Sequence, residues 1–116
     1  MNLPHLPPIL FANEVLEKEE GRAVVACSFP SQPDLPMFIE AAAQATSALS
    51  TTQEPQKGFL VLVKECRLLQ RAHGLSYAIT LSLSASLGNS SEFSFEARSE
   101  AKELVAQGFV MVVVEG

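Results

Sequence analysis

Glu40 and Gln44 stand out in this 116-residue sequence because their types and spacing could support acid–base chemistry. They are four residues apart, so on a helix they would lie on one face, one turn from each other. A carboxyl group on the first turns of a buried helix could transfer protons, and the amide could hydrogen-bond to it and orient it. The plainer alternatives are a surface glutamate favoured by the helix dipole and an ordinary polar helix residue.

Ser28 and two histidines are the other candidates for chemistry. Ser28 could be a weak nucleophile or donor, but no histidine lies between His5 and His73, so a simple serine at a strand end is the alternative. His5, beside prolines, is interpreted as a packing or interface residue. His73 is interpreted as a turn residue, which could take part in catalysis only if the fold brings that turn to the helix. The two separated histidines lack a carboxylate cluster, so we expect no metal site and no cofactor.

The helix that carries Glu40 and Gln44 is predicted over about 35–51. Asp34 fits the N-cap position, Pro36 is tolerated in the first turn, and apolar residues recur at helical spacing. Alanine occupies positions 41, 42, 43, 45 and 48, which makes the helix thin. A thin helix lets a sheet curl closely around it, because little side-chain bulk separates the backbones.

The rest of the chain predicts six strands. They cover 9–17, 22–29, 59–69, 75–87, 93–97 and 104–115, with a charged turn at 18–21. The stretch 75–87 alternates for thirteen residues, which is about 43 Å at roughly 3.3 Å per residue and indicates a strongly curved sheet. The apolar run that opens 59–69 indicates a strand buried on both faces. One helix cannot cover both faces of such a sheet, so the other face must meet water or a second subunit.

Composition places further limits on function. The length suits one domain over residues 1–116, and a net charge of −5 without a basic run argues against nucleic-acid binding. The apolar runs are too short to span a bilayer and no signal peptide is recognised, so we expect a cytoplasmic protein without membrane contact. Cys27 and Cys66 form no CxxC pair and are predicted to be reduced core thiols.

Four segments, in order, carry a resemblance to a known family. Residues 3–17 read LPHLPPILFANEVLE, 28–37 read SFPSQPDLPM, 40–44 read EAAAQ and 103–111 read ELVAQGFVM. They resemble LPHRYPFLLVDRVLE, the GHFPGxPxMPG loop, an EAMAQ-like helix and KLVAEAEIM of the β-hydroxyacyl-acyl-carrier-protein dehydratases of bacterial fatty-acid synthesis. Residues 58–62, GFLVL, are similar to the GFLLG-like third strand of divergent members from specialised acyl or polyene pathways.

The resemblance implies an α+β hot-dog fold, in which a curved antiparallel sheet of six strands wraps a central helix. It also implies a 3-hydroxyacyl thioester substrate, on acyl carrier protein or coenzyme A. In the family each site combines a loop histidine of one chain with a helix glutamate of the other. Glu40 matches the glutamate, whereas the histidine position holds Ser28 or a neighbour, and the loop is two residues shorter.

Three functions remain open at this stage. The chain could be a degenerate dehydratase subunit that forms a heterodimer with a histidine-bearing relative. It could instead be an autonomous enzyme of the same fold, as a homodimer, either a dehydratase with rearranged groups or a thioesterase that uses a helix carboxylate and water. It could also be a non-catalytic acyl-binding or scaffold protein. The residues expected to contact an acyl substrate are Pro36, Met37, Phe38, Phe59 and Leu60. The basic residues Lys64, Arg67 and Arg71 either attract a phosphopantetheine arm or mark a solvated strand.

Overall fold

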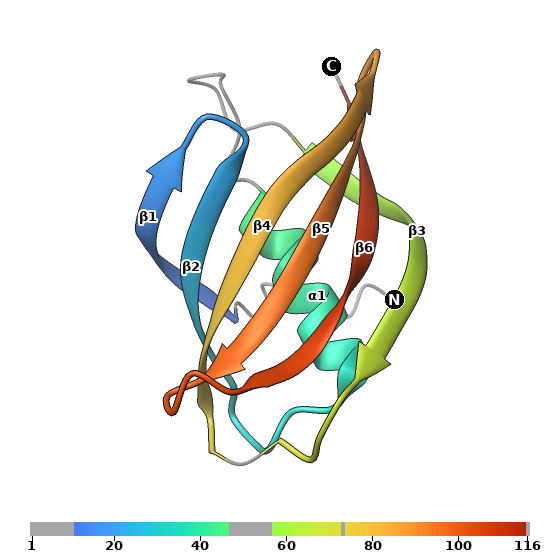
Figure 1. Cartoon of the computed structure of the whole chain (residues 1–116). Coiled ribbons are helices and arrows are strands. Elements are labelled where there is room, and N and C mark those ends of the chain that lie inside the picture. Colours follow the sequence, from blue (N-terminus) through green and yellow to red (C-terminus); the bar gives the residue numbers. More distant parts are fainter. Residues whose placement is uncertain (1–10, 47–56, 73, 116) are drawn as a thin grey trace, which may run out of the picture.

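The computed structural model describes residues 11–46, 57–72 and 74–115, which form one sheet bent around one helix (Figure 1). The order of elements is the predicted one, β-β-α-β-β-β-β. The bounds are β1 (Ala12–Glu19), β2 (Arg22–Ser28), α1 (Leu35–Ala45), β3 (Lys57–Leu68), β4 (Ser76–Leu87), β5 (Ser90–Ser99) and β6 (Leu104–Glu115).

The six strands form a single antiparallel sheet in the order β1-β2-β4-β5-β6-β3. The third strand in sequence therefore crosses to the far side of the sheet and pairs with the last one. The sheet does not close, so β1 and β3 are its two edges. In Figure 1 the sheet lies in front and α1 crosses behind it, on the concave side. The predicted α+β architecture is confirmed.

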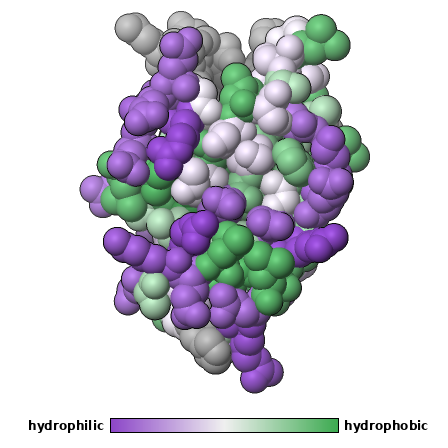
Figure 2. Space-filling view, in the orientation of Figure 1, coloured by the Kyte–Doolittle hydropathy of each residue, from purple (hydrophilic) through white to green (hydrophobic). Residues whose placement is uncertain are grey.

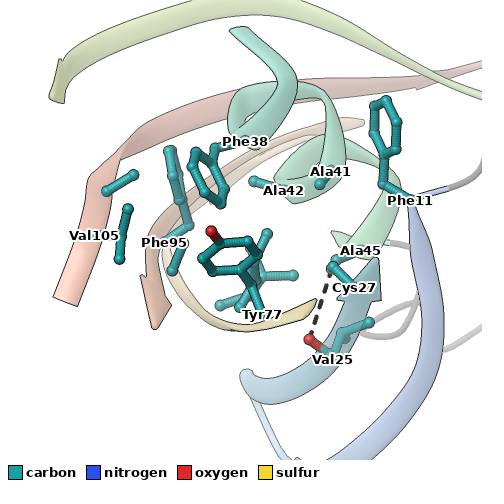
Figure 3. Packing of buried hydrophobic residues seen from close by; sticks show 14 of the residues in the cluster. Phe11, Val25, Cys27, Phe38, Ala41, Ala42, Ala45, Tyr77, Phe95 and Val105 are labelled. Atoms are coloured by element: carbon teal, nitrogen blue, oxygen red, sulfur yellow. Dashed lines mark hydrogen bonds between the residues drawn. The ribbon is translucent and has the colours of Figure 1, made fainter. Parts of the chain in front are cut away.

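The core lies between α1 and the concave face of the sheet (Figure 3). Ala41 and Ala42 are fully buried, which lets the sheet approach the helix backbone as the alanine pattern predicted. Phe38 is the largest fully buried side chain of the helix. The sheet contributes side chains from its middle strands, of which the largest fully buried ones are Ile79, Leu81, Phe95 and Val110.

The first hairpin differs in detail from the prediction. β1 continues to Glu19, so Lys18 and Glu19 belong to the strand and not to the turn. The turn is tighter, and Gly21 adopts a φ of 74°, which glycine tolerates at low cost. The residues of an exposed edge strand need not be apolar. The charged residues Lys18 and Glu19 can therefore pair with β2, although their composition indicated a turn. Ile9 and Leu10 lie outside the described residues.

The alternation of β4 holds for only half of the strand. Tyr77, Ile79 and Leu81 are buried, but Leu83 is 44% exposed and Leu87 is 85% exposed. All residues from 83 to 87 are exposed, so this end of β4 extends beyond the core. The pairing with β5 is also irregular between Leu83 and Ala85. The strand predicted over 75–87 is confirmed as β4, and the alternation of its residues matches their burial up to Leu81.

Where the structure describes its side chains, from Leu62 onward, β3 is not buried on both faces, contrary to the prediction from its apolar run. It is an edge strand, and Leu62 and Val63 are 50% and 41% exposed. The sequence showed how apolar β3 is, but the strand order decided that one of its sides has no neighbouring strand. The part of the predicted helix beyond Thr46 lies outside the described residues.

Candidate functional site

The start of α1 is closed by its own cap. The Asp34 carboxylate accepts a hydrogen bond from the Met37 N–H at 3.0 Å, as the sequence predicted for an N-cap. The Phe38 N–H bonds to the Asp34 carbonyl, and Pro36 has no N–H. Three of the first four helix residues therefore cannot offer a backbone donor to a thioester oxygen. Contact of Pro36 or Met37 with an acyl substrate stays a prediction.

Glu40 lies on the exposed side of α1, one turn beyond this cap. Gln44 follows on the same face, and its Nε2 donates to Glu40 Oε1 at 3.4 Å. The Oε1 atom of Gln44 accepts from the backbone N–H groups of Phe11 at 2.8 Å and Ala12 at 3.3 Å. The predicted pair is thus brought together, and the start of β1 completes its surroundings. Sequence reasoning did not find this part of β1, because a backbone contact leaves no mark on residue type.

Ser28 is not brought to Glu40. It pairs with Ser76, one position after Cys27, which pairs with the buried Tyr77. Because successive strand residues face opposite sides of a sheet, Ser28 stands on the convex side and α1 lies on the concave side. Its hydroxyl accepts a hydrogen bond from Asn13 Nδ2 at 2.6 Å, which ties β1 to β2.

Phe38 is a core residue in this structure, with 0% of its side chain exposed. Its ring meets Tyr77 edge-on at a centroid distance of 5.0 Å (Figure 3). It also meets Phe29 at a centroid distance of 5.3 Å. Phe11 extends the cluster beyond Phe29 at 4.8 Å. These aromatic rings fill the space between the helix and the sheet. Contact between Phe38 and an acyl chain stays a prediction.

The two predicted substrate residues on β3 are placed by register alone. Phe59 pairs with Val113 and Leu60 pairs with Val112, while their side chains lie outside the described part of the structure. His5 and His73 also lie outside the described residues. No cluster of His, Cys, Asp and Glu able to hold a metal ion occurs within 11–46, 57–72 and 74–115.

The basic residues Lys64 and Arg67 on β3 and Arg71 in the connection after it divide into two environments. Lys64 forms an ion pair with Glu92 at 2.9 Å and lies 5.3 Å from the Phe109 ring centroid. The hydrogen bond and charge of Glu92 raise the pKa of Lys64, and the Lys64 hydrogen bond lowers the pKa of Glu92. Lys64 is therefore engaged within the sheet, whereas Arg67 and Arg71 are exposed.

A cavity of about 280 Å³ lies where the β3–β4 and β5–β6 connections meet. Its described lining combines Arg71 and Gln70 with the acidic Glu100 and Glu103. The mixed charge gives this cavity no clear preference for an anion. None of the residues predicted to be catalytic lines it.

Both cysteines are free thiols. Cys27 is buried in the core, and burial raises the pKa of its thiol to about 12. Cys66 is half-buried and packs on the backbone of Gly108. The described hydrogen bonds of the two thiols go to backbone carbonyls of the strands and not to Glu40.

The convex face of the sheet, seen in Figure 2, carries weakly polar residues over its middle and hydrophilic ones along its flanks. Thr80, Ser82 and Ser94 belong to this face, because their neighbours along β4 and β5 point into the core. Their small hydroxyl side chains fit the expectation that this face meets water or a second subunit. No helix of the described residues is long and apolar enough to cross a membrane.

No protein-family model matches this sequence. Among solved structures, the chain is similar to the dehydratase heterocomplex ApeI:P from Xenorhabdus doucetiae, with a TM-score of 0.80, 16% identity and coverage of 98% of this chain and 88% of that one. It is also similar to smu.793 from Streptococcus mutans bound to acetyl CoA, with a TM-score of 0.72, 14% identity and 97% coverage of both chains.

A third similar structure is a mutant thioesterase from Staphylococcus aureus, with a TM-score of 0.71, 11% identity and coverage of 89% of this chain and 93% of that one. The shared architecture is a curved antiparallel sheet wrapped around one helix. This chain has the hot-dog fold. At these low sequence identities the similarity establishes only the fold. Any catalytic chemistry must be argued from the residues of this chain.

Within this hot-dog fold, the side of α1 that faces away from the sheet carries little charge. Glu40 is the single charged residue from Leu35 to Ala45. Solvent-exposed helix faces of stable monomers are normally rich in charged residues. The neighbouring edge strand β3 exposes Leu62 and Val63 as well. A carboxylate thus stands on an otherwise weakly polar surface next to an open sheet edge.

Proposed function

We propose that this chain is a hot-dog subunit that contributes Glu40 to a site for dehydrating 3-hydroxyacyl thioesters. A related chain that carries a histidine would complete the site. The observation that carries the proposal is the placement of Glu40 on the exposed side of α1, with its carboxylate hydrogen-bonded by Gln44. The resemblance of residues 40–44 to the EAMAQ-like helix supports the same assignment.

The reaction needs two proton transfers. A base removes a proton from C2 of the thioester, an acid protonates the hydroxyl at C3, and water leaves as the C2–C3 double bond forms. One carboxyl group cannot easily serve both carbons at once. The sequence offers only His5 and His73, at the two ends of a long histidine-free stretch, so the second group is assigned to a partner chain.

Two features support a partner chain on this side of the molecule. The α1 face around Glu40 is nearly uncharged, and β3 presents an unpaired, partly apolar edge. An open edge of this kind is a template for pairing with another strand. A related hot-dog protein would extend the sheet there and bring its own loop beside α1. The similar dehydratase ApeI:P is itself a heterocomplex.

The test is to mix or co-express this chain with histidine-bearing hot-dog proteins and to follow complex formation by size exclusion. The complex is then assayed with 3-hydroxyacyl thioesters on acyl carrier protein and on coenzyme A. We expect Glu40→Gln to reduce kcat at least 100-fold, in line with the usual value of an acid–base group of about 10²–10⁴. The matched control is Glu96→Gln, since Glu96 is a carboxylate on the convex face that pairs with Arg98.

A complex that is fully active with Glu40→Gln would contradict the catalytic assignment and favour an acyl-binding or scaffold role. Failure to form any complex with such relatives would contradict the partner assignment.

Thioester hydrolysis is the second candidate. An exposed carboxylate can activate water without a histidine, and the fold matches that of several thioesterases. The isolated chain would then release free thiol from acyl coenzyme A, and Glu40→Gln would abolish the release. Thiol release by the isolated chain, without any partner, would favour this candidate over dehydration.

A further inference from the structure

The cavity of about 280 Å³ at the junction of the β3–β4 and β5–β6 connections has no part in the chemistry proposed for Glu40. Its described lining includes none of the residues assigned to that site. Its volume is close to the lower limit of ligand sites in proteins, which span about 300–1,000 Å³. A small molecule therefore fits this space, whereas a long acyl chain does not.

Hydrogen bonds hold the two walls of this cavity in place. On the wall made by the β3–β4 connection, Gln70 Nε2 donates to the Leu104 carbonyl at 2.7 Å. On the other wall, the Ser99 N–H donates to the Glu103 carbonyl at 3.0 Å, and the Ser99 hydroxyl accepts from the Glu103 N–H at 3.3 Å. The cavity is thus formed before any ligand binds, which lowers the entropic cost of binding.

Three charged side chains line the cavity, Arg71 on one wall and Glu100 and Glu103 on the other. Within the described part of the chain, none of their charged groups takes part in an ion pair or a hydrogen bond. The neighbouring cation on β5, Arg98, is instead engaged with Glu96 at 3.6 Å. Opposite charges that share one cavity without meeting leave room for a ligand that contacts both.

The charges of the cavity specify the charges of its ligand. A guanidinium group binds a carboxylate through two parallel hydrogen bonds, and a carboxylate binds an ammonium group. One arginine and two glutamates therefore match a molecule with one carboxylate and two ammonium groups. The lining also includes Leu75 and Val105, whose apolar side chains can cover methylene groups.

We propose that this cavity binds a free basic amino acid of the lysine type. The carboxylate contacts Arg71, and the two ammonium groups contact Glu100 and Glu103. A dicarboxylate would face two glutamates, and a diamine would leave Arg71 without a partner, so neither matches all three charges. Because the three charged residues are exposed, we expect a Kd of about 0.1–10 mM.

The test follows ¹H–¹⁵N spectra of the full chain during titration with L-lysine and two matched analogues. Cadaverine lacks the carboxylate, and Nα-acetyl-L-lysine lacks the α-ammonium group. With L-lysine, the backbone amide signals of Gly74, Ser99 and Ala101 should shift saturably, and that of Gly21 should not. Both analogues should bind about 5-fold more weakly or worse, because each has lost one charged contact.

Two variants assign the charged groups. Arg71→Gln should weaken L-lysine binding about 5-fold or more and should not weaken cadaverine binding, since cadaverine has no carboxylate. Glu103→Gln should weaken the binding of both ligands. The matched controls are Arg67→Gln and Glu20→Gln, which remove exposed charges of the same two kinds outside the cavity lining and should leave both affinities unchanged.

Three results would overturn the proposal. The first is the lack of saturable shifts at the lining residues when L-lysine is raised above the expected Kd range. The second is equal affinity for L-lysine and Nα-acetyl-L-lysine, because the cavity would then take the carboxyl end of a peptide chain. The third is a loss of binding in the control variants as large as that in Arg71→Gln. None of these measurements involves Glu40, so each outcome leaves the proposed dehydration site untouched.

Discussion

The Lys64 ammonium lies 2.9 Å from the Glu92 carboxylate and joins the edge strand β3 to β5 across β6. The Glu92 carboxylate also accepts a hydrogen bond from the Ser84 hydroxyl on β4 at 2.9 Å. The network therefore spans four adjacent strands on the convex face. It adds a side-chain link across β6 to the backbone pairing that holds the β3 edge.

This ion pair predicts a pH window for stability. The pKa of Glu92 is lowered from 4.5, so its contribution is present above that pH and is lost as the pH falls through the lowered value. The pKa of Lys64 is raised from 10.5, so its contribution is present below that pH and is lost as the pH rises through the raised value. Glu92→Gln should lower Tm at pH 7, and the difference from wild type should shrink in acid. A difference that stays constant down to pH 2 would contradict this origin.

Gly108 is required by the close approach of β3. A Cβ at this position would meet the Cys66 Cα at 2.7 Å, which is backbone that cannot turn aside. Gly108→Ala should cost about 1–3 kcal/mol of unfolding free energy, measured by urea denaturation, as expected for overpacking. Cys66→Ala should restore only part of the loss, because it removes the sulfur and leaves the Cα in place. Full restoration would locate the conflict in the thiol alone.

The N-cap of α1 predicts a selective effect of substitution. Asp34→Ala removes the acceptor for the Met37 N–H and should cost about 0.5–2 kcal/mol. Asp34→Ser or Asp34→Asn should cost much less, since both retain a capping oxygen. Urea denaturation of the three variants tests the ranking. Equal losses in all three would show that the charge, and not the hydrogen bond, is what matters.

The buried thiol predicts slow modification. With a pKa of about 12, Cys27 has a thiolate fraction of roughly one in ten thousand at pH 8, and it is sterically covered as well. A thiol reagent should therefore modify Cys27 in the native protein only at the rate of unfolding or local opening. Denaturation should expose it at once. Rapid native labelling that persists in Cys66→Ala would contradict the burial of Cys27.

The candidate site was predictable where one element contained it. Glu40 and Gln44 share a helix face because they are four residues apart. Asp34 caps the same helix by accepting a hydrogen bond from Met37, three positions later in the sequence. Ser28 could not be judged in this way, because its face depends on the register of β2 against β4. The support that Gln44 receives from Phe11 and Ala12 spans more than thirty residues and uses backbone atoms only.

The sequence by itself determined the elements and their order, because helical spacing, alternation and turn residues act over a few neighbouring positions. Its alanines at 41, 42 and 45 also required a sheet packed closely on the helix. Only the tertiary structure decided that β3 pairs with β6 and becomes an edge, that the alternation of β4 breaks at Leu83, and that β1 supports Gln44. These features depend on long-range backbone pairing, whose partners and register are chosen by the packing of the whole sheet.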